Sequence, residues 1–243
     1  MRFIVMHKVD AKMEAGGPPD RKIIDDMGAL VQGSLKDGVF LNGAGLHRSS
    51  RRVRLEVDRG GAGLSAVSGP YEGRNELVSG LVMISARSLD AAVEHAKTVS
   101  SSLGGAEVEV GPVVEPWDLG LMTKPGAAPE RFLLLCKSTP ADEAGHGGAR
   151  HAAAARALSA RLGDDGAVLA AESLAPAEKG SRLASASNGK RWWVDGPFAE
   201  SKELIAGFSI LQLPSKAEAL AWADRYAAIL GDNEVDVREL NDR

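Results

Sequence analysis

The chain has 243 residues, of which 44% are hydrophobic and 26% are charged, an ordinary mixture for a globular protein of one or two domains. Its formal net charge is −4 and neither half has a basic excess, so nucleic acid is not an expected partner. Cys136 is the only cysteine, which excludes an internal disulfide and a cysteine-based zinc site, and we expect no metal and no cofactor. No apolar stretch approaches the roughly 20 residues of a membrane-spanning helix, so we expect a cytoplasmic protein without membrane contact.

The first half of the chain predicts alternating strands and helices. Its first strand lies within MRFIVMHK, residues 1–8, and a helix is expected from an N-cap at Asp20 to Gly38, because apolar residues recur there at helical spacing. The elements expected after it are a strand at Val39–Leu41, a hairpin of Val53–Val57 with Leu64–Val67, a long strand at Leu77–Ser85, a helix from Ser88 and a last strand at Ala106–Val113.

The second half predicts the same order. The expected elements are a strand at Phe132–Cys136, an alanine-rich helix at Ala149–Leu162, a strand at Ala167–Ala171, a hairpin, a long strand at Leu204–Leu213, a helix from Ser215 and a last strand at Glu234–Leu240.

The two halves also match in sequence. Residues 1–8 (MRFIVMHK) pair with 130–137 (ERFLLLCK), 38–46 (GVFLNGAGL) with 166–174 (GAVLAAESL), 69–80 (GPYEGRNELVSG) with 196–207 (GPFAESKELIAG), and 106–110 (AEVEV) with 233–237 (NEVDV). The offsets are 129, 128, 127 and 127 residues, in the same order along both halves. This pattern predicts a tandem duplication, with domains at residues 1–121 and 131–243 and a linker at 122–130, where prolines and a glycine interrupt helix and strand.

Each predicted copy has the order β-α-β-hairpin-β-α-β. Right-handed crossovers then give an α+β, ferredoxin-like βαββαβ domain: an antiparallel sheet with both helices on one face. The other face needs a cover, and the second copy provides one, so we expect the sheets to pack face to face as a pseudo-dimeric α/β barrel. Whether whole chains also form a homodimer is left open.

A sequence motif connects the second half to a known family. Residues Asp195–Glu203 read DGPFAESKE, which resembles the signature of the YCII-related (DGPF) family, and Glu172-Ser173-Leu174 resembles the family's Gly-Glu-x-Leu segment. The resemblance covers nearly the whole of each half. It implies a ferredoxin-like fold that dimerises as an α/β barrel with a cleft between sheet and loops. Some relatives of that wider fold are isomerases or dehalogenating enzymes with a His–Asp pair, and DGPF proteins also occur beside sigma factors.

The first half departs from this motif. Ser68 replaces Asp195, Gly73 replaces Glu200 and Ala44 replaces Glu172. If the acids do chemistry, we therefore expect the second half to hold the working site.

The candidate catalytic residues are Asp195, Glu200 and Glu172. Carboxylates that crowd into one cleft repel one another, which raises the pKa of at least one of them toward neutrality, as acid–base catalysis requires. The candidate ligand-binding residues are Lys202, Glu203, Phe198, Trp193 and His7. The alternative is structural: Gly196 and Pro197 form a turn, Asp195 braces it and Phe198 fills the core.

The sequence leaves two function classes open. The first is a protein that binds a small molecule near the second-half motif, with cofactor-free acid–base catalysis as one form of it. The second is a non-catalytic regulatory or interaction module, which the sigma-factor association of the family suggests. A concave pocket containing Asp195 or Glu172 would favour the first, and a broad exposed apolar patch the second.

Overall fold

A computed structural model of the chain describes residues 1–58, 63–126, 129–162, 166–185, 190–198, 201–231 and 234–242. Strands and helices alternate in the predicted order. The first part contains β1 (Arg2–Lys8), α1 (Ala11–Glu14), α2 (Arg21–Lys36), β2 (Phe40–Leu46), the 3-10 turn η1 (Ser49–Arg51), β3 (Val53–Val57), β4 (Leu64–Ser68), β5 (Val78–Ala86), α3 (Leu89–Ser102) and β6 (Val108–Val114). The second part contains β7 (Glu130–Lys137), the π-turn η2 (Asp142–His146), α4 (Gly147–Leu162), β8 (Ala167–Ser173), the 3-10 turn η4 (Ala177–Lys179), β9 (Ser181–Ser185), β10 (Arg191–Asp195), β11 (Ile205–Gln212), α5 (Lys216–Leu230) and β12 (Val235–Glu239).

Side-chain caps fix the starts of two helices. The Ser88 side chain accepts a hydrogen bond from the backbone N–H of Ala91 at the start of α3, and Ser215 accepts one from Glu218 at the start of α5. Asp20 occupies the predicted N-cap position of α2 but makes no side-chain cap bond there.

The described strands pair into one antiparallel sheet of 12 strands. It folds into two layers, which we name after their central strands. The β1 layer has the order β10-β9-β12-β1-β11-β2, and the β7 layer has the order β6-β7-β5-β8, with the β3–β4 hairpin added beside β6. Two residue pairs, Gly45 with Val114 and Leu46 with Val113, join β2 to β6 and so connect the layers.

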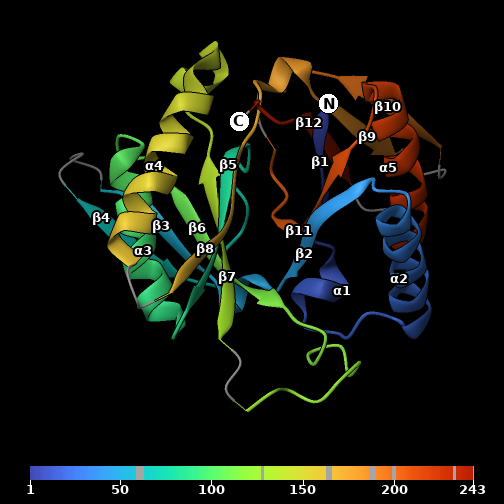
Figure 1. Cartoon of the computed structure of the whole chain (residues 1–243), viewed down its shortest axis with the longest axis horizontal. Coiled ribbons are helices and arrows are strands. Elements are labelled where there is room, and N and C mark those ends of the chain that lie inside the picture. The colour runs from blue at the N-terminus through green and yellow to red at the C-terminus, as the bar shows by residue number, and fades with distance from the viewer. Residues whose placement is uncertain are drawn as a thin grey trace.

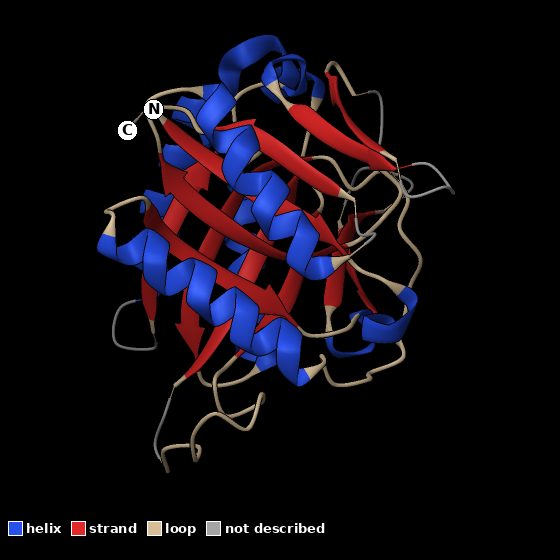
Figure 2. Ribbon diagram, turned by 90° about the vertical axis from the view of Figure 1, so that its right-hand side faces the viewer, coloured by secondary structure: helices blue, strands red, loops and turns tan. Residues whose placement is uncertain are grey.

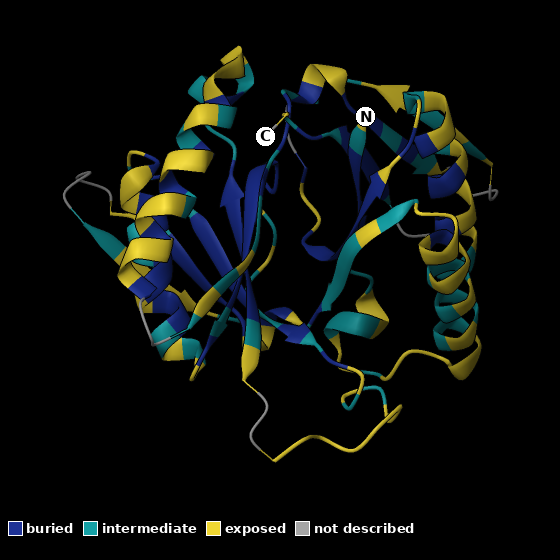
Figure 3. Cartoon of the chain, viewed as in Figure 1, coloured by how far each residue is buried: buried dark blue, intermediate teal, exposed yellow. Residues whose placement is uncertain are grey.

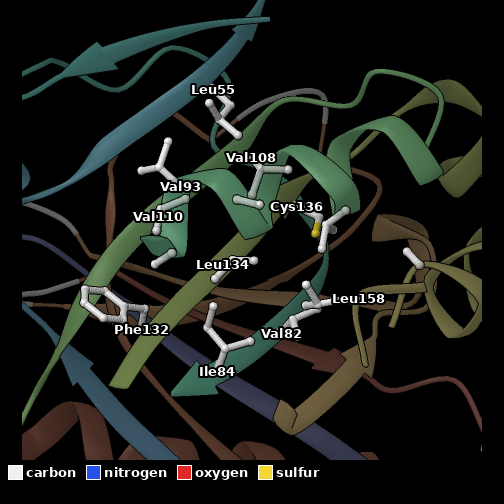
Figure 4. Close-up of a cluster of buried hydrophobic side chains, with 14 of the residues drawn as sticks. Leu55, Val82, Ile84, Val93, Val108, Val110, Phe132, Leu134, Cys136 and Leu158 are labelled. Atoms are coloured by element: carbon white, nitrogen blue, oxygen red, sulfur yellow. The ribbon is translucent and has the colours of Figure 1, made fainter. Parts of the chain in front are cut away.

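Alternation along the strands divides the apolar residues between three cores. On β1, Ile4 and Met6 lie in a core shared with β7 residues Leu133 and Leu135, which places the two layers face to face. The opposite face of each layer packs on a pair of helices. In the β7 layer that outer core contains Val82, Ile84, Leu134, Cys136, Val93 and Leu158 (Figure 4).

The helices therefore form the outside of the molecule. Figure 1 shows α3 and α4 on one side, α2 and α5 on the other and the strands between them, and Figure 2 shows α2 and α5 side by side across the strands of the β1 layer. The strands are largely buried, while the helices expose their outer faces (Figure 3). Within the described residues, no helix combines the length and apolarity needed to cross a membrane. The fold is thus a mixed α/β structure built on a large antiparallel sheet.

The strand pairing corrects one expectation. We expected each half to build its own sheet, but β1 lies between β12 and β11, and β7 lies between β6 and β5. The first strand of each half is therefore held by the last two strands of the other half. The sequence could not predict this exchange, because the apolar runs of β1 and β7 are nearly equivalent and either one fits either gap.

Candidate functional site

A small cavity lies where the β7 layer, α4 and the two ends of the chain meet. We call it the His151 cavity; its volume is about 110 Å³. Strands β5 and β8 form its floor, α4 forms one wall, and the start of β1 and the segment after β12 close it. The lining residues are Arg2, Leu81, Val82, Gly148, His151, Ala152, Ala171, Glu172, Ser173, Asn241 and Asp242.

An ion pair forms the polar side of this cavity. Arg2 Nη1 donates to Glu172 Oε2 at 2.6 Å, and the Glu172 side chain is only 4% exposed. Arg2 Nη2 donates to the backbone oxygen of Asn241 at 2.9 Å, so the same guanidinium links the two ends of the chain. Glu172, one of the acids predicted from the sequence, therefore does line a cavity.

His151 contributes a buried imidazole from α4. Its Nε2 lies 3.0 Å from Ser79 Oγ and 3.8 Å from Asp142 Oδ1. The ring lies directly over Gly80, where any Cβ would overlap it, so this site requires glycine on β5. Burial lowers the pKa of His151, and the Asp142 carboxylate opposes that shift.

The two ring nitrogens of His151 have different surroundings. Ser79 Oγ can donate to Nε2 or accept from it, so this contact fits either neutral tautomer, while Nδ1 packs against Gly80. Ser79, His151 and Asp142 resemble a catalytic triad in composition but not in geometry. In a triad the serine and the acid contact different ring nitrogens, whereas here both lie at Nε2. We therefore assign Ser79 and Asp142 to positioning the ring.

The DGPF motif lies elsewhere. Asp195 ends β10 with its side chain 76% exposed, and it accepts hydrogen bonds from Ser181 Oγ at 2.6 Å and Lys216 Nζ at 2.9 Å. The Ser181 hydrogen bond and then Lys216 lower the pKa of Asp195, which keeps it ionised. A Cβ at Gly196 would overlap the backbone oxygen of Ala177, so the turn requires glycine.

The other predicted ligand-binding residues do not gather around Asp195. Phe198 lies over the Arg182 guanidinium at 4.5 Å, and Trp193 Nε1 donates to Asp224 at 3.0 Å. Lys202 and Glu203 are exposed, and Glu200 falls outside the described residues. Asp195 contacts Ser181 and Lys216, whereas Glu172 contacts Arg2, and no described motif residue is among the lining residues of the His151 cavity. The structure does not bring Asp195 and Glu172 together, because β10 and β8 lie at opposite ends of the strand order.

His7 is buried on the helix-facing side of β1. Its Nδ1 lies 2.6 Å from the Tyr226 hydroxyl on α5, and the ring packs over Gly207. Burial lowers the pKa of His7 to about 4, and the positive charges of Lys8 and Arg52 add to this against the effect of Asp10. His7 lies outside the His151 cavity.

Buried ion pairs are a feature that sequence reasoning missed. Lys8 at the end of β1 lies 3.0 Å from Asp236 on β12, and Lys137 at the end of β7 pairs with Glu76 and lies 3.4 Å from Glu109 on β6. All five side chains are less than 10% exposed. A sequence signal existed: the first strand ends on a lysine in both halves, Lys8 after His7 and Lys137 after Cys136.

In both halves an arginine lies over a glycine of the neighbouring strand, but the two halves differ in which strand of the pair carries the arginine. In one, Arg52 precedes β3, lies over Gly111 of the neighbouring β6 and donates to the backbone oxygen of His47. In the other, Arg238 on β12 lies over Gly180, which precedes β9, and donates to the backbone oxygen of Ala175. Either strand of the pair can therefore carry the arginine, provided that its neighbour carries glycine.

No group of three or more metal-ligating side chains occurs in the described parts of the chain. Residues 131–241 match the family of the YCII-related domain. This one match lies in the second half of the chain, and the comparisons give no evidence for a second copy in the first. No curated protein and no solved structure shows a significant match to the chain.

Proposed function

We propose that this chain binds a small molecule in the His151 cavity and that His151 serves there as an acid–base group without a cofactor. The observation that carries the proposal is the combination in one cavity of a buried imidazole with the Arg2–Glu172 ion pair. Binding sites characteristically combine an apolar wall with a few convergent polar groups. Leu81, Val82 and Ala171 supply that wall.

Size and charge narrow the ligand class. A cavity of about 110 Å³ has room for roughly three or four waters, and hence for a ligand with only a few non-hydrogen atoms. Its lining carries the Glu172 and Asp242 carboxylates against the single guanidinium of Arg2. This balance favours a neutral or cationic ligand that donates hydrogen bonds, such as a small alcohol, amide or amine.

The proposed chemistry uses the ring positions given above. With its pKa lowered by burial, His151 is neutral near pH 7, so its imidazole can accept a proton. The imidazolium formed then lies close to the Asp142 carboxylate, at 3.8 Å from Nε2, which stabilises the new charge. Glu172, held by Arg2, would accept a hydrogen bond from the ligand and orient it.

The alternative is a non-catalytic interaction module. The larger concave feature is a groove of about 530 Å³ between α2 and α5, with Leu30 and Trp222 among its lining residues. Charged side chains, Asp37, Glu218 and Arg225, also line this groove. The exposed large apolar residues of the described chain are spread over several elements, with Trp192 and Val194 together on β10 and Leu121 next to Met122. This distribution supports the small-molecule proposal over the interaction module.

We also propose an origin for the fold. We infer that the two halves are tandem YCII-related copies whose strands have exchanged, so that each layer is one ferredoxin-like unit of a pseudo-dimeric barrel. The related lysine–carboxylate pairs and the exchanged Arg52 and Arg238 support this inference.

A ligand screen on the full chain tests the function. Small alcohols, amides and amines would be added at increasing concentration while the thermal unfolding midpoint and the NMR signals of the histidine rings are followed. A true ligand at a hundred times its dissociation constant adds about 2.7 kcal/mol of stability and shifts the His151 signals. His151→Gln and Glu172→Gln should each abolish that stabilisation.

The matched control is His146→Gln, which changes an exposed histidine five residues before His151. It should leave binding intact. Binding that survives both cavity variants, or ligand-induced shifts confined to the Trp193 and Asp195 region, would move the site to the motif.

A further inference from the structure

A cluster of buried charges occupies the interior beside β3 and β6. Arg52 Nη1 donates to Glu109 Oε1 at 2.8 Å, and Arg54 Nη2 donates to Glu76 Oε1 at 2.8 Å. Lys137 contacts both carboxylates. These five side chains are at most 8% exposed, so the buried part of the cluster has three cations against two carboxylates. Glu107 adds a third carboxylate, which lies 3.2 Å from Arg54 Nε at the edge of the cluster. Its side chain is 30% exposed.

The hydrogen bonding of this cluster is incomplete. Two buried donor atoms, Arg52 Nη2 and Tyr71 Oη, have no hydrogen-bond acceptor among the described residues. A third, Arg54 Nε, makes no hydrogen bond, although the Glu107 carboxylate lies 3.2 Å from it. An unmet buried donor typically costs about 1–3 kcal/mol. An acceptor group that reaches these donors would relieve the deficit, and a carboxylate offers two acceptor oxygens.

The three donors belong to one neighbourhood. The Tyr71 ring lies over the Arg54 guanidinium at 4.2 Å, and Arg52 and Arg54 lie 2.8 and 3.6 Å from the two oxygens of Glu109. Burial raises the pKa of Tyr71; among the charged groups, Glu109 and Arg52 act on it most strongly. The phenol therefore stays protonated and can donate a hydrogen bond.

The second half has no equivalent donor set. Phe198 replaces Tyr71 over Arg182, and Arg182 Nε donates to Asp236 at 2.7 Å. Gly180 stands in place of Arg52, and the arginine from β12, Arg238, has one unsatisfied atom, its Nε. The clustering of donors is thus specific to the first half, in which the motif has lost its acids.

We propose that Arg52, Arg54 and Tyr71 form a binding site for one small monovalent carboxylate of the size of formate or acetate. The planar guanidinium of arginine matches the two oxygens of a carboxylate, and the phenol supplies a further donor. The site is separate from the His151 cavity and does not depend on the function proposed for it.

The test is anion-dependent thermal unfolding of the full chain at constant pH and ionic strength, with formate or acetate replacing chloride. Wild type should show a saturable rise of its midpoint with both carboxylates and a smaller response to nitrate. Tyr71→Phe keeps the ring over Arg54 and removes one donor, so it should weaken carboxylate binding about tenfold. Arg52→Lys keeps the charge but loses the fork, and should abolish the response.

Phe198→Tyr is the matched control, because it places a phenol at the equivalent position of the second half. It should keep the wild-type response. The Tyr71 variant decides the question even if the Arg52 variant does not fold. An unsaturable or absent carboxylate effect in wild type, or an equal affinity in Tyr71→Phe, would overturn the site and indicate that water satisfies these donors.

Discussion

Moving the buried arginine from position 52 to position 111 on the neighbouring strand β6 should preserve the packing of the protein interior. Arg52 is fully buried and donates to Glu109 at 2.8 Å, to the backbone oxygen of Ile205 at 2.8 Å and to that of His47. Removing one partner of a buried ion pair costs about 3–5 kcal/mol. Because Glu109 keeps Lys137 at 3.4 Å, and because Ile205 loses a donor, we expect Arg52→Gly to cost about 4 kcal/mol of unfolding free energy.

The compensating change is Gly111→Arg. Alone it should destabilise by about 1–3 kcal/mol, because a Cβ at Gly111 would lie 3.2 Å from Arg52 Cγ and Cδ in a filled interior. In the double variant the new arginine enters the space left by Arg52, as Arg238 does over Gly180. The double variant should therefore be more stable than the sum of the single losses by about 2 kcal/mol.

Urea unfolding of the four proteins of this double-mutant cycle measures the coupling. The reciprocal pair, Gly180→Arg with Arg238→Gly, is the control in the other half and should couple with the same sign. If the loss in the Arg52 and Gly111 double variant equals the sum of the single losses within about 0.5 kcal/mol, the two arginine positions are not interchangeable and the reasoning fails.

Three further predictions follow from burial and exposure. The pKa of His7 is 6.5 in the unfolded chain and about 4 in the folded protein, so its contribution to stability is complete above pH 6.5. As the pH falls toward 4, the free energy of unfolding should decline by up to about 3 kcal/mol. In denaturant titrations His7→Gln should flatten this pH dependence, whereas His146→Gln, at an exposed histidine, should not. Burial raises the pKa of the Cys136 thiol to about 12, so a thiol reagent should modify it at the rate of unfolding, and modification of the native chain within seconds would contradict this. Asp195→Asn should leave the unfolding midpoint and ligand binding unchanged, and a loss of ligand binding would return the motif to the site.

Much of the local structure could be predicted from the sequence. The apolar run Phe132–Cys136, the capping serines Ser88 and Ser215 and the long strands all have their expected types. These signals depend on residues close together in the chain: regularly spaced apolar residues predict a helix or strand, and a serine hydroxyl that accepts from the N–H three residues later predicts a helix start. Strand partnership depends on distant segments, and two halves with equivalent first strands present two solutions with nearly the same local chemistry.

The candidate site was predicted in part for the same reason. Glu172 was singled out by the sequence and lines the His151 cavity. Asp195 was singled out as well, but the sequence could not tell that β10 is an edge strand on which this acid faces solvent. His151 was missed because its partner is a glycine on β5: a helix residue that packs over Gly80 leaves no trace in its own sequence neighbourhood.

The exchange of strands gives the motif segments a role of their own. Ser201, within the motif, accepts a hydrogen bond from Lys8, and its backbone oxygen accepts one from the N–H of Glu76 in the equivalent segment of the first half. The two segments thus meet and satisfy each other's backbone. This supports the structural interpretation of the motif, as a joint between the halves.

Because of the strand exchange, both layers contribute residues to the His151 cavity. Its floor and the α4 wall come from the β7 layer, but Arg2 enters with β1 and Asn241 follows β12, both from the β1 layer. Because β1 is held between β12 and β11, the Arg2 guanidinium reaches Glu172 only when the two layers are closed on each other. A ligand held by that ion pair would therefore bind the closed molecule alone, and its binding energy would add to the packing between the layers. The site and the interlayer core are coupled by the same strand.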